Sequence, residues 1–279
     1  SSTTNFVNEG AFVKANLVGV NYIGYSSYVT NFTNASTGTI EVSGGTLQFW
    51  GGGSSTHSGS LTIAANAEVY FQVGNHSFLS GATVTDSGTL HIGSSTVSVA
   101  EALTIPNLKL SSGQGGLTAG GALTVETYEQ SQGTLTSSTD MTVTDDFSWS
   151  GGFQTGSGTT IIGSEATAIL GSTTLYMRGN RKFLNNGTLT QNAGSALYAD
   201  QSSQASATNA AGGVWTLNSN NNTRFAYNTN DSAMTFTNAG TLNKANSGTI
   251  YFGAHAGTSA FIKAATGRVG VTGGVLWFD

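Results

Sequence analysis

The chain contains no cysteine, a single proline and few charged side chains. Without Cys it can form neither disulfide bonds nor a cysteine-based zinc site or nucleophile. Only 8% of its 279 residues are charged, and its formal net charge is -5. Ordinary globular proteins are about 25% charged. Nine Lys and Arg residues are too few for the basic surface that nucleic acids require, so we expect no nucleic-acid partner.

Long apolar runs and a secretion signal are also missing. No apolar stretch approaches the ~18 residues of a membrane helix, so the sequence predicts no membrane span. Residues 1–5 contain neither a charged nor an apolar signal region, and there is no initiator Met. We therefore expect the chain to be processed, or to be a piece of a longer protein. Abundant Thr, Ser, Asn and Gly without Cys is typical of secreted bacterial surface proteins, which predicts an extracellular or cell-surface location.

The remaining composition indicates a folded β protein. Hydrophobic residues make up 38% of the chain and aromatic residues 10%, which is too apolar and too weakly charged for a disordered segment. The 39 Gly follow no Gly-X-Y period, which excludes collagen. A five-residue unit recurs along the chain: Gly, then a small or hydroxyl residue, then two apolar residues separated by any one residue. It occurs at 38–42, 59–63, 88–92, 121–125 and 248–252. Such alternation predicts short strands, and the Gly predicts turns.

A second element places an aromatic residue two positions before Asn and four before Gly. It occurs at 6–10, 183–187 and 236–240. Irregular steps of about 20 to 30 residues are typical of solenoid coils. Strands of successive coils stack about 4.8 Å apart and bury one apolar row at each position. We therefore predict one all-β parallel solenoid over residues 1–279, with roughly 11 coils of irregular length.

A longer repeat links the two ends of the sequence. Residues 6–16 read FVNEGAFVKAN, and residues 236–246 read FTNAGTLNKAN, about 230 positions later. Residues 32–49 match residues 261–278 at nearly the same offset. The sequence therefore predicts a tandem repeat of ~230 residues, in which 1–49 and 231–279 are equivalent parts. Adjacent repeats stacked end to end are the expected partners.

The aromatic-x-Asn-x-Gly units, residues 44–49 (GGTLQF) and residues 147–152 (FSWSGG) carry a resemblance to known proteins. Over nearly its full length the chain resembles the β-helix repeat regions of giant secreted bacterial surface proteins, the filamentous-haemagglutinin-type and autotransporter-passenger adhesins. These motifs are loose and reflect the fold more than an activity. The resemblance implies a right-handed parallel β-helix in an adhesin, matrix or filament component, with no catalytic residue and no cofactor.

From these observations we expect a non-catalytic structural or adhesive segment of a long extracellular repeat protein. Other copies in a fibre and surface glycans are further candidate partners. The alternative is a polysaccharide-binding or polysaccharide-cleaving β-helix protein. For cleavage, Asp145 and Asp146 are the only adjacent carboxylates, and they are expected in a turn because neighbouring strand residues point to opposite faces. The four His residues show no metal-ligand spacing, so no metal site is predicted.

Two sets of residues remain as candidate surface sites. The candidate glycan contacts are Trp50, Trp149, Arg178, Arg181 and Lys182. Aromatic side chains in β-solenoids more often fill the core, and a basic cluster is more often a solvated loop. The candidate N-glycosylation sites are Asn31, Asn34, Asn75, Asn186, Asn221 and Asn230. Six such sites are about the number expected by chance in a chain this rich in Asn, Ser and Thr.

Overall fold

The computed structural model describes residues 3–15, 17–25, 28–171, 173–218, 223–224, 226–228, 232–253 and 258–278. These residues form strands and turns only, so none of them belongs to a helix that is long and apolar enough to cross a membrane. The described strands pair in parallel and stack as a β-solenoid of about 12 turns. This confirms the predicted parallel β-helix and its approximate number of coils. The chain divides into two compact units, Ser1–Thr139 and Asp140–Asp279.

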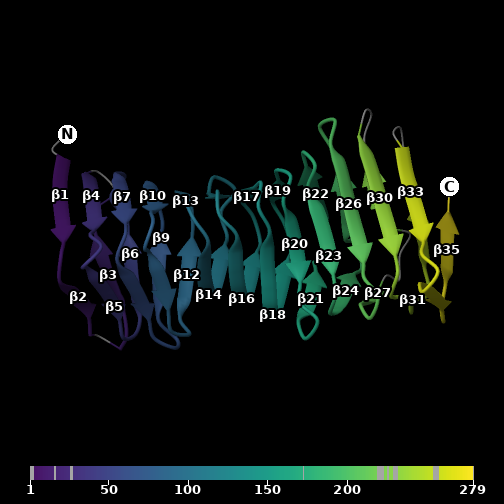
Figure 1. Ribbon diagram of the computed structural model, residues 1–279, viewed down its shortest axis with the longest axis horizontal. Helices are drawn as coiled ribbons and strands as arrows, with labels where there is room; N and C mark the ends of the chain where they lie inside the picture. Colours follow the sequence, from purple (N-terminus) through teal and green to yellow (C-terminus); the bar gives the residue numbers. More distant parts are fainter. Residues whose placement is uncertain are drawn as a thin grey trace. The chain divides into compact units, whose positions relative to one another are not determined.

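In the first unit most coils contribute one strand to each of three parallel sheets (Figure 1). The first sheet contains β1 (Thr3–Asn8), β4 (Val29–Asn34), β7 (Ser54–His57), β10 (Asn75–Phe78), β13 (Thr96–Val99), β15 (Gly116–Ala119) and β17 (Thr134–Ser137). The second contains β2 (Ala11–Lys14), β5 (Thr39–Val42), β8 (Ser60–Ile63) and β11 (Thr83–Thr85). The third contains β3 (Val20–Ile23), β6 (Thr46–Phe49), β9 (Glu68–Phe71), β12 (Thr89–Ile92), β14 (Leu103–Leu110) and β16 (Leu123–Gln130).

The second unit is also built from parallel strands and begins with a long strand whose two parts pair with different neighbours. The amino-terminal part of β18 (Met141–Trp149) pairs with β20 (Thr159–Ile162), and its carboxy-terminal part pairs with β21 (Thr167–Leu170). One row continues from β20 through β23 (Lys182–Asn185), β26 (Gln204–Asn209), β30 (Ala233–Asn238) and β33 (Thr258–Lys263). Another continues from β21 through β24 (Thr188–Asn192), β27 (Val214–Asn218), β31 (Thr241–Lys244) and β34 (Arg268–Val271). The remaining strands are β19 (Phe153–Thr155), β22 (Thr174–Arg178), β25 (Ala196–Ala199), β28 (Thr223–Arg224), β29 (Ala226–Asn228), β32 (Thr249–Phe252) and β35 (Val275–Phe278).

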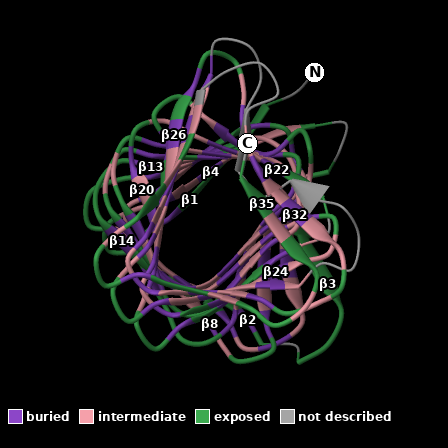
Figure 2. Cartoon of the chain, turned by 90° about the vertical axis from the view of Figure 1, so that its right-hand side faces the viewer, coloured by how far each residue is buried: buried purple, intermediate pink, exposed green. Residues whose placement is uncertain are grey.

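The core consists of side chains that alternate inward along each strand. In β5, Ile40 and Val42 are fully buried, and they pair in register with Leu61 and Ile63 of β8. Because strands alternate with a period of two, equal register places apolar residues of successive coils directly over one another. Exposed residues lie mainly in the turns outside the strands (Figure 2). The alternation read from the sequence therefore identifies the buried rows.

The Asn residues of the aromatic-x-Asn-x-Gly units belong to inward ladders of side-chain amides, which Asn209 joins at the equivalent position. In the second unit Asn185 donates to Asn209 Oδ1 (2.9 Å), and Asn209 donates to Asn238 Oδ1 (2.8 Å). Each of these three residues is fully buried, and each also donates to a backbone carbonyl of a neighbouring coil. The ladder thus supplies hydrogen bonds to carbonyls at the corners of the coils.

The Gly of these units permits close stacking of the turns. A Cβ at Gly240 would lie only 2.2 Å from the Gly213 carbonyl oxygen. Two residues earlier is the ladder residue Asn238, and two residues before that is the buried ring of Phe236. Aromatic core, amide ladder and backbone contact therefore explain the spacing of the unit.

The strand pattern supports the tandem repeat. The order and lengths of β1 to β6 recur in β30 to β35. For example, the first strand of each set has six residues, Thr3–Asn8 and Ala233–Asn238, and the last has four, Thr46–Phe49 and Val275–Phe278. That 1–49 and 231–279 are equivalent parts of a ~230-residue unit remains the interpretation of this pattern.

Candidate functional site

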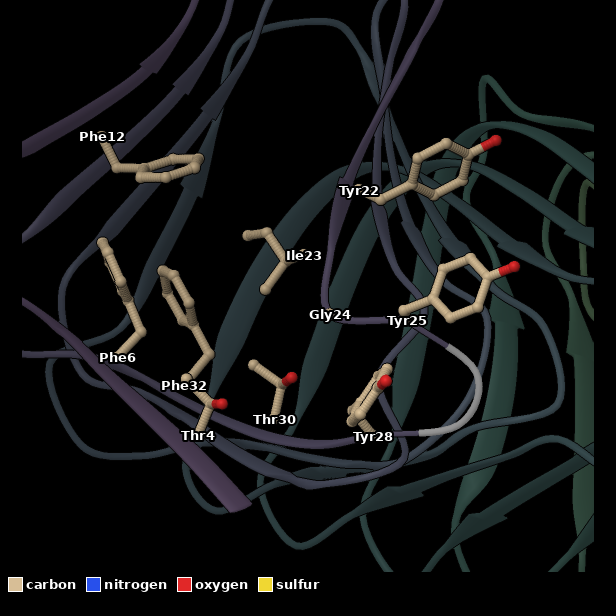
Figure 3. Close-up of a pocket in the computed structure, with 10 residues that line it drawn as sticks. All are labelled: Thr4, Phe6, Phe12, Tyr22, Ile23, Gly24, Tyr25, Tyr28, Thr30 and Phe32. Atoms are coloured by element: carbon tan, nitrogen blue, oxygen red, sulfur yellow. The ribbon is translucent and has the colours of Figure 1, made fainter. Parts of the chain in front are cut away.

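A cavity lined mainly by aromatic residues lies in the first unit, beside β1 to β3. Its volume is about 440 Å³. Figure 3 shows its lining residues Thr4, Phe6, Phe12, Tyr22, Ile23, Gly24, Tyr25, Tyr28, Thr30 and Phe32. The rings of Phe6 and Phe32 are stacked at 5.1 Å, and the ring of Phe12 meets Phe6 edge-on at 5.8 Å. We call this cavity the aromatic pocket.

An exposed aromatic cluster adjoins the aromatic pocket. The ring centroid of Trp50 lies 5.2 Å from that of Tyr22 and 5.0 Å from that of Tyr25. Both tyrosines are about half exposed, and Trp50 is half-buried. Phe49, the preceding residue, points into the core, so strand alternation directs Trp50 outward as expected. Of the candidate glycan contacts, Trp50 is therefore the aromatic residue in an accessible position.

Two other candidate glycan contacts are buried and cannot touch a glycan in this fold. Trp149 is fully buried, and its Nε1 donates to the Gly151 carbonyl oxygen (2.9 Å). Arg181 is also fully buried, and its Nη2 donates to the hydroxyl of Thr160 (2.7 Å). Arg181 lies just before β23, two positions from Phe183, so both side chains point inward. The expectation that the basic cluster is a solvated loop was therefore wrong for Arg181.

The remaining basic candidates do not form a common surface with Arg181. Arg178 makes paired hydrogen bonds to the carboxylate of Asp200, from Nε to Oδ1 and from Nη2 to Oδ2, both 2.9 Å. Its guanidinium also lies 3.7 Å from the ring centroid of Phe153. Such bidentate and cation–π contacts fix the side chain in the structure. Lys182 is exposed at the start of β23.

The candidate glycosylation sites differ in accessibility. Asn34 is fully buried in an amide ladder, where it accepts a hydrogen bond from Asn8, so it cannot carry a glycan in the folded chain. Asn75 is exposed, whereas Asn31 and Asn186 are partly buried. Outside the described residues lie Asn221 and Asn230.

The adjacent carboxylates lie within a strand. Asp145 and Asp146 are exposed in the middle of β18, where the inward alternation is interrupted. The expectation that this pair lies in a turn was therefore wrong, because both residues belong to a continuous strand. Asp146 accepts a hydrogen bond from the Thr167 hydroxyl. Within the described part of the chain, no three His, Cys, Asp or Glu residues are grouped to hold a metal ion.

A buried histidine pair in the first unit was not recognised in the sequence. His57 and His76 are about 1–2% exposed, and their rings stack at 5.9 Å. Burial, with a smaller contribution from the charge of His76, lowers the pKa of His57 to about 3. Burial lowers the pKa of His76 to about 4, although Val73 accepts a hydrogen bond from its ring. The signal that was missed is strand parity, because His76 alternates with Phe78 and both point inward.

None of the protein-family models, curated proteins or solved structures with which the chain was compared matches it.

Proposed function

We propose that the chain is a non-catalytic structural or adhesive segment of a long extracellular repeat protein, a cell-surface adhesin, matrix or filament component. The observation that carries this proposal is the recurrence of the six-strand order of β1 to β6 in β30 to β35. A repeat that preserves strand order, strand length and inward rows can extend a solenoid by simple addition of coils.

Contacts on the outer surface also support a structural role. Polar side chains join successive coils, as in the hydrogen bonds between Asn31 and Asn5 (2.9 Å) and between Ser98 and Ser77 (2.9 Å). The hydroxyls of Thr62 and Thr85 share another bond of 3.2 Å. Such bonds, together with the backbone ladders, hold each coil to the next without many charges. Stacked coils of this kind would expose repeated polar rows to other chains or surfaces.

The test is the location and size of the native protein. An antibody against the purified chain should label the surface of intact, unpermeabilised cells that produce it. On denaturing gels it should recognise a polypeptide several times larger than the 28.4 kDa of this chain. Labelling only after permeabilisation, or a native product of 28.4 kDa, would contradict the proposal.

The aromatic cluster of Trp50, Tyr22 and Tyr25 favours a second candidate function, polysaccharide binding. Exposed aromatic rings can pack against the apolar faces of sugar rings. The rings of Tyr22 and Tyr25 each lie about 5 Å from the ring of Trp50 on the surface of the first unit. The residues that line the adjoining aromatic pocket include no Asp or Glu, which favours binding over cleavage.

Affinity electrophoresis of the whole chain through gels containing neutral polysaccharides tests this candidate. The Trp50→Ala variant should lose at least about tenfold in affinity, since the central ring of the cluster is removed. Tyr70→Ala is the matched control, because Tyr70 is a half-buried aromatic residue that stacks on His91 elsewhere in the same unit. Equal retardation of the wild type and both variants would exclude the cluster as a glycan site.

A further inference from the structure

The strands that border the aromatic pocket have counterparts in the second unit that are covered by another coil. On one side, β30 and β31 pair with β33 and β34, just as β1 and β2 pair with β4 and β5. On the other side, β30 pairs with β26 and β31 pairs with β27. The second unit therefore shows how the equivalent residues pack when a preceding coil covers them.

The two sets of strands agree in their side-chain geometry. The rings of Phe6 and Phe32 stack at 5.1 Å with an interplanar angle of 13°, and those of their counterparts Phe236 and Phe261 stack at 5.8 Å and 18°. This agreement shows that the aromatic face of β1 is built like the face of β30.

The polar contacts agree as well. Asn8 donates to the Thr39 carbonyl oxygen (3.0 Å), and Asn238 donates to the equivalent carbonyl of Arg268 (2.8 Å). A buried lysine is also shared, because Lys14 donates to the Gly44 carbonyl and Lys244 to the equivalent Gly273 carbonyl.

The covering coil in the second unit fills the space that the aromatic pocket leaves open. Trp215 of β27 is fully buried, pairs with Leu242 and meets the ring of Phe236 at right angles, 5.2 Å away. Phe236 is consequently 0% exposed, whereas its counterpart Phe6 is 42% exposed. The inward alanines of β26 lie over β30, which leaves room for these large rings.

The covering coil also supplies a polar contact. Asn209 of β26 donates to Asn238 Oδ1 (2.8 Å) and thereby continues the amide ladder. The counterpart of Asn238 is Asn8, which itself donates to Asn34 Oδ1 (2.8 Å). A coil with Asn at the same position would extend the ladder of the first unit by one step.

We propose that the aromatic pocket is the binding site for a coil with the sequence of residues 204–218, supplied by a further copy of the repeat. In this register the incoming Ala207 lies opposite Phe6, the incoming Asn209 opposite Asn8, and the incoming Trp215 opposite Phe12. The inference rests on the repeat architecture of the proposed function and specifies the joint between two adjacent repeats. The tryptophan and the asparagine make the interaction specific for this coil. A coil without the tryptophan would leave the phenyl rings uncovered, and one without the asparagine would not extend the amide ladder.

Fusion of residues 200–230 directly before Ser1 tests the joint, since it preserves the 230-residue spacing. The extended chain should show at least tenfold slower amide hydrogen exchange in β1 and β2 than the parent chain. It should also bind less of the fluorescent probe anilinonaphthalene sulfonate, because the aromatic pocket is filled. Unchanged exchange and probe binding would overturn the proposal.

Two variants of the added coil separate specific filling of the pocket by the tryptophan from a nonspecific extension. Trp215→Ala in the added copy should restore exchange and probe binding to the parental values, whereas Thr216→Ala, whose position faces outward, should retain the protection. Equal protection by both variants would contradict the role of the tryptophan. The circular dichroism spectrum of the parent chain is the reference that shows whether each fusion is folded. The outcome is independent of where the native protein is located, so it can fail while the proposed function stands.

Discussion

Acidification from pH 8 to pH 5 is expected to lower the unfolding free energy of the first unit by on the order of 4 kcal/mol. The cause is the buried pair His57 and His76, with folded-state pKa values of about 3 and about 4. In the unfolded chain both imidazoles have a pKa near 6.5. Protons therefore bind the unfolded state first as the pH falls, and the stability that is fully present above pH 6.5 is lost progressively towards the folded-state values.

The surroundings of the pair explain why it stays neutral. His57 packs against the rings of Phe32, Phe49, Phe71 and Phe78. Neither of its ring nitrogens has a hydrogen-bond partner among the described residues. A charge placed there would be both desolvated and unpaired, which is strongly unfavourable.

Urea unfolding at pH 8 and pH 5 measures the effect. The double variant His57→Leu and His76→Leu, of similar side-chain volume, should lose most of the difference between the two pH values. His91→Gln serves as the control, because His91 lies on the outer face and hydrogen-bonds Glu68 (2.7 Å). That bond lowers the pKa of Glu68, so the contribution of Glu68 is lost below its ordinary value of 4.5 and lies outside this pH range. An unchanged pH dependence in the double variant would show that other groups cause it.

The sequence predicts the strands of this protein well because two strong constraints act on every coil. Backbone ladders require a parallel register, and the narrow interior requires alternation, so segments such as 38–42 and 59–63 can be recognised without coordinates. The aromatic-x-Asn-x-Gly unit adds a third constraint, because its Asn belongs to an amide ladder and its Gly permits a close backbone contact. These constraints are local and repeat in every coil.

The candidate site was less predictable because it depends on where the alternation starts and stops. In β18 the inward alternation is interrupted, because Asp145 and Asp146 are both exposed between two segments whose inward residues keep the same parity. Trp149 keeps the inward parity of Met141 and Val143, but the turn that the sequence predicts at Asp145 and Asp146 obscured this continuity. Arg181 and His57 are polar residues at inward positions, and composition alone assigns such residues to the surface.

Trp149→Ala is expected to lower the unfolding free energy of the second unit by about 3 to 5 kcal/mol. The indole is fully buried and pairs in register with Leu170, so its removal leaves a cavity that the backbone ladders on either side prevent from closing. It also removes the donor to the Gly151 carbonyl oxygen. Denaturant unfolding monitored by circular dichroism measures the loss.

Trp50→Ala is the matched comparison, because it removes the same side chain from an outward position. It should destabilise the first unit by less than about 1 kcal/mol, since a half-buried ring leaves no sealed cavity. If Trp149→Ala left stability unchanged while Trp50→Ala caused a large loss, the inward and outward assignments of both residues would be wrong. Because parity along a strand is all-or-none, such a result would place the whole inward row of β18 on the surface, including Phe147. The pair of variants therefore tests the registration of the solenoid as well as two side chains.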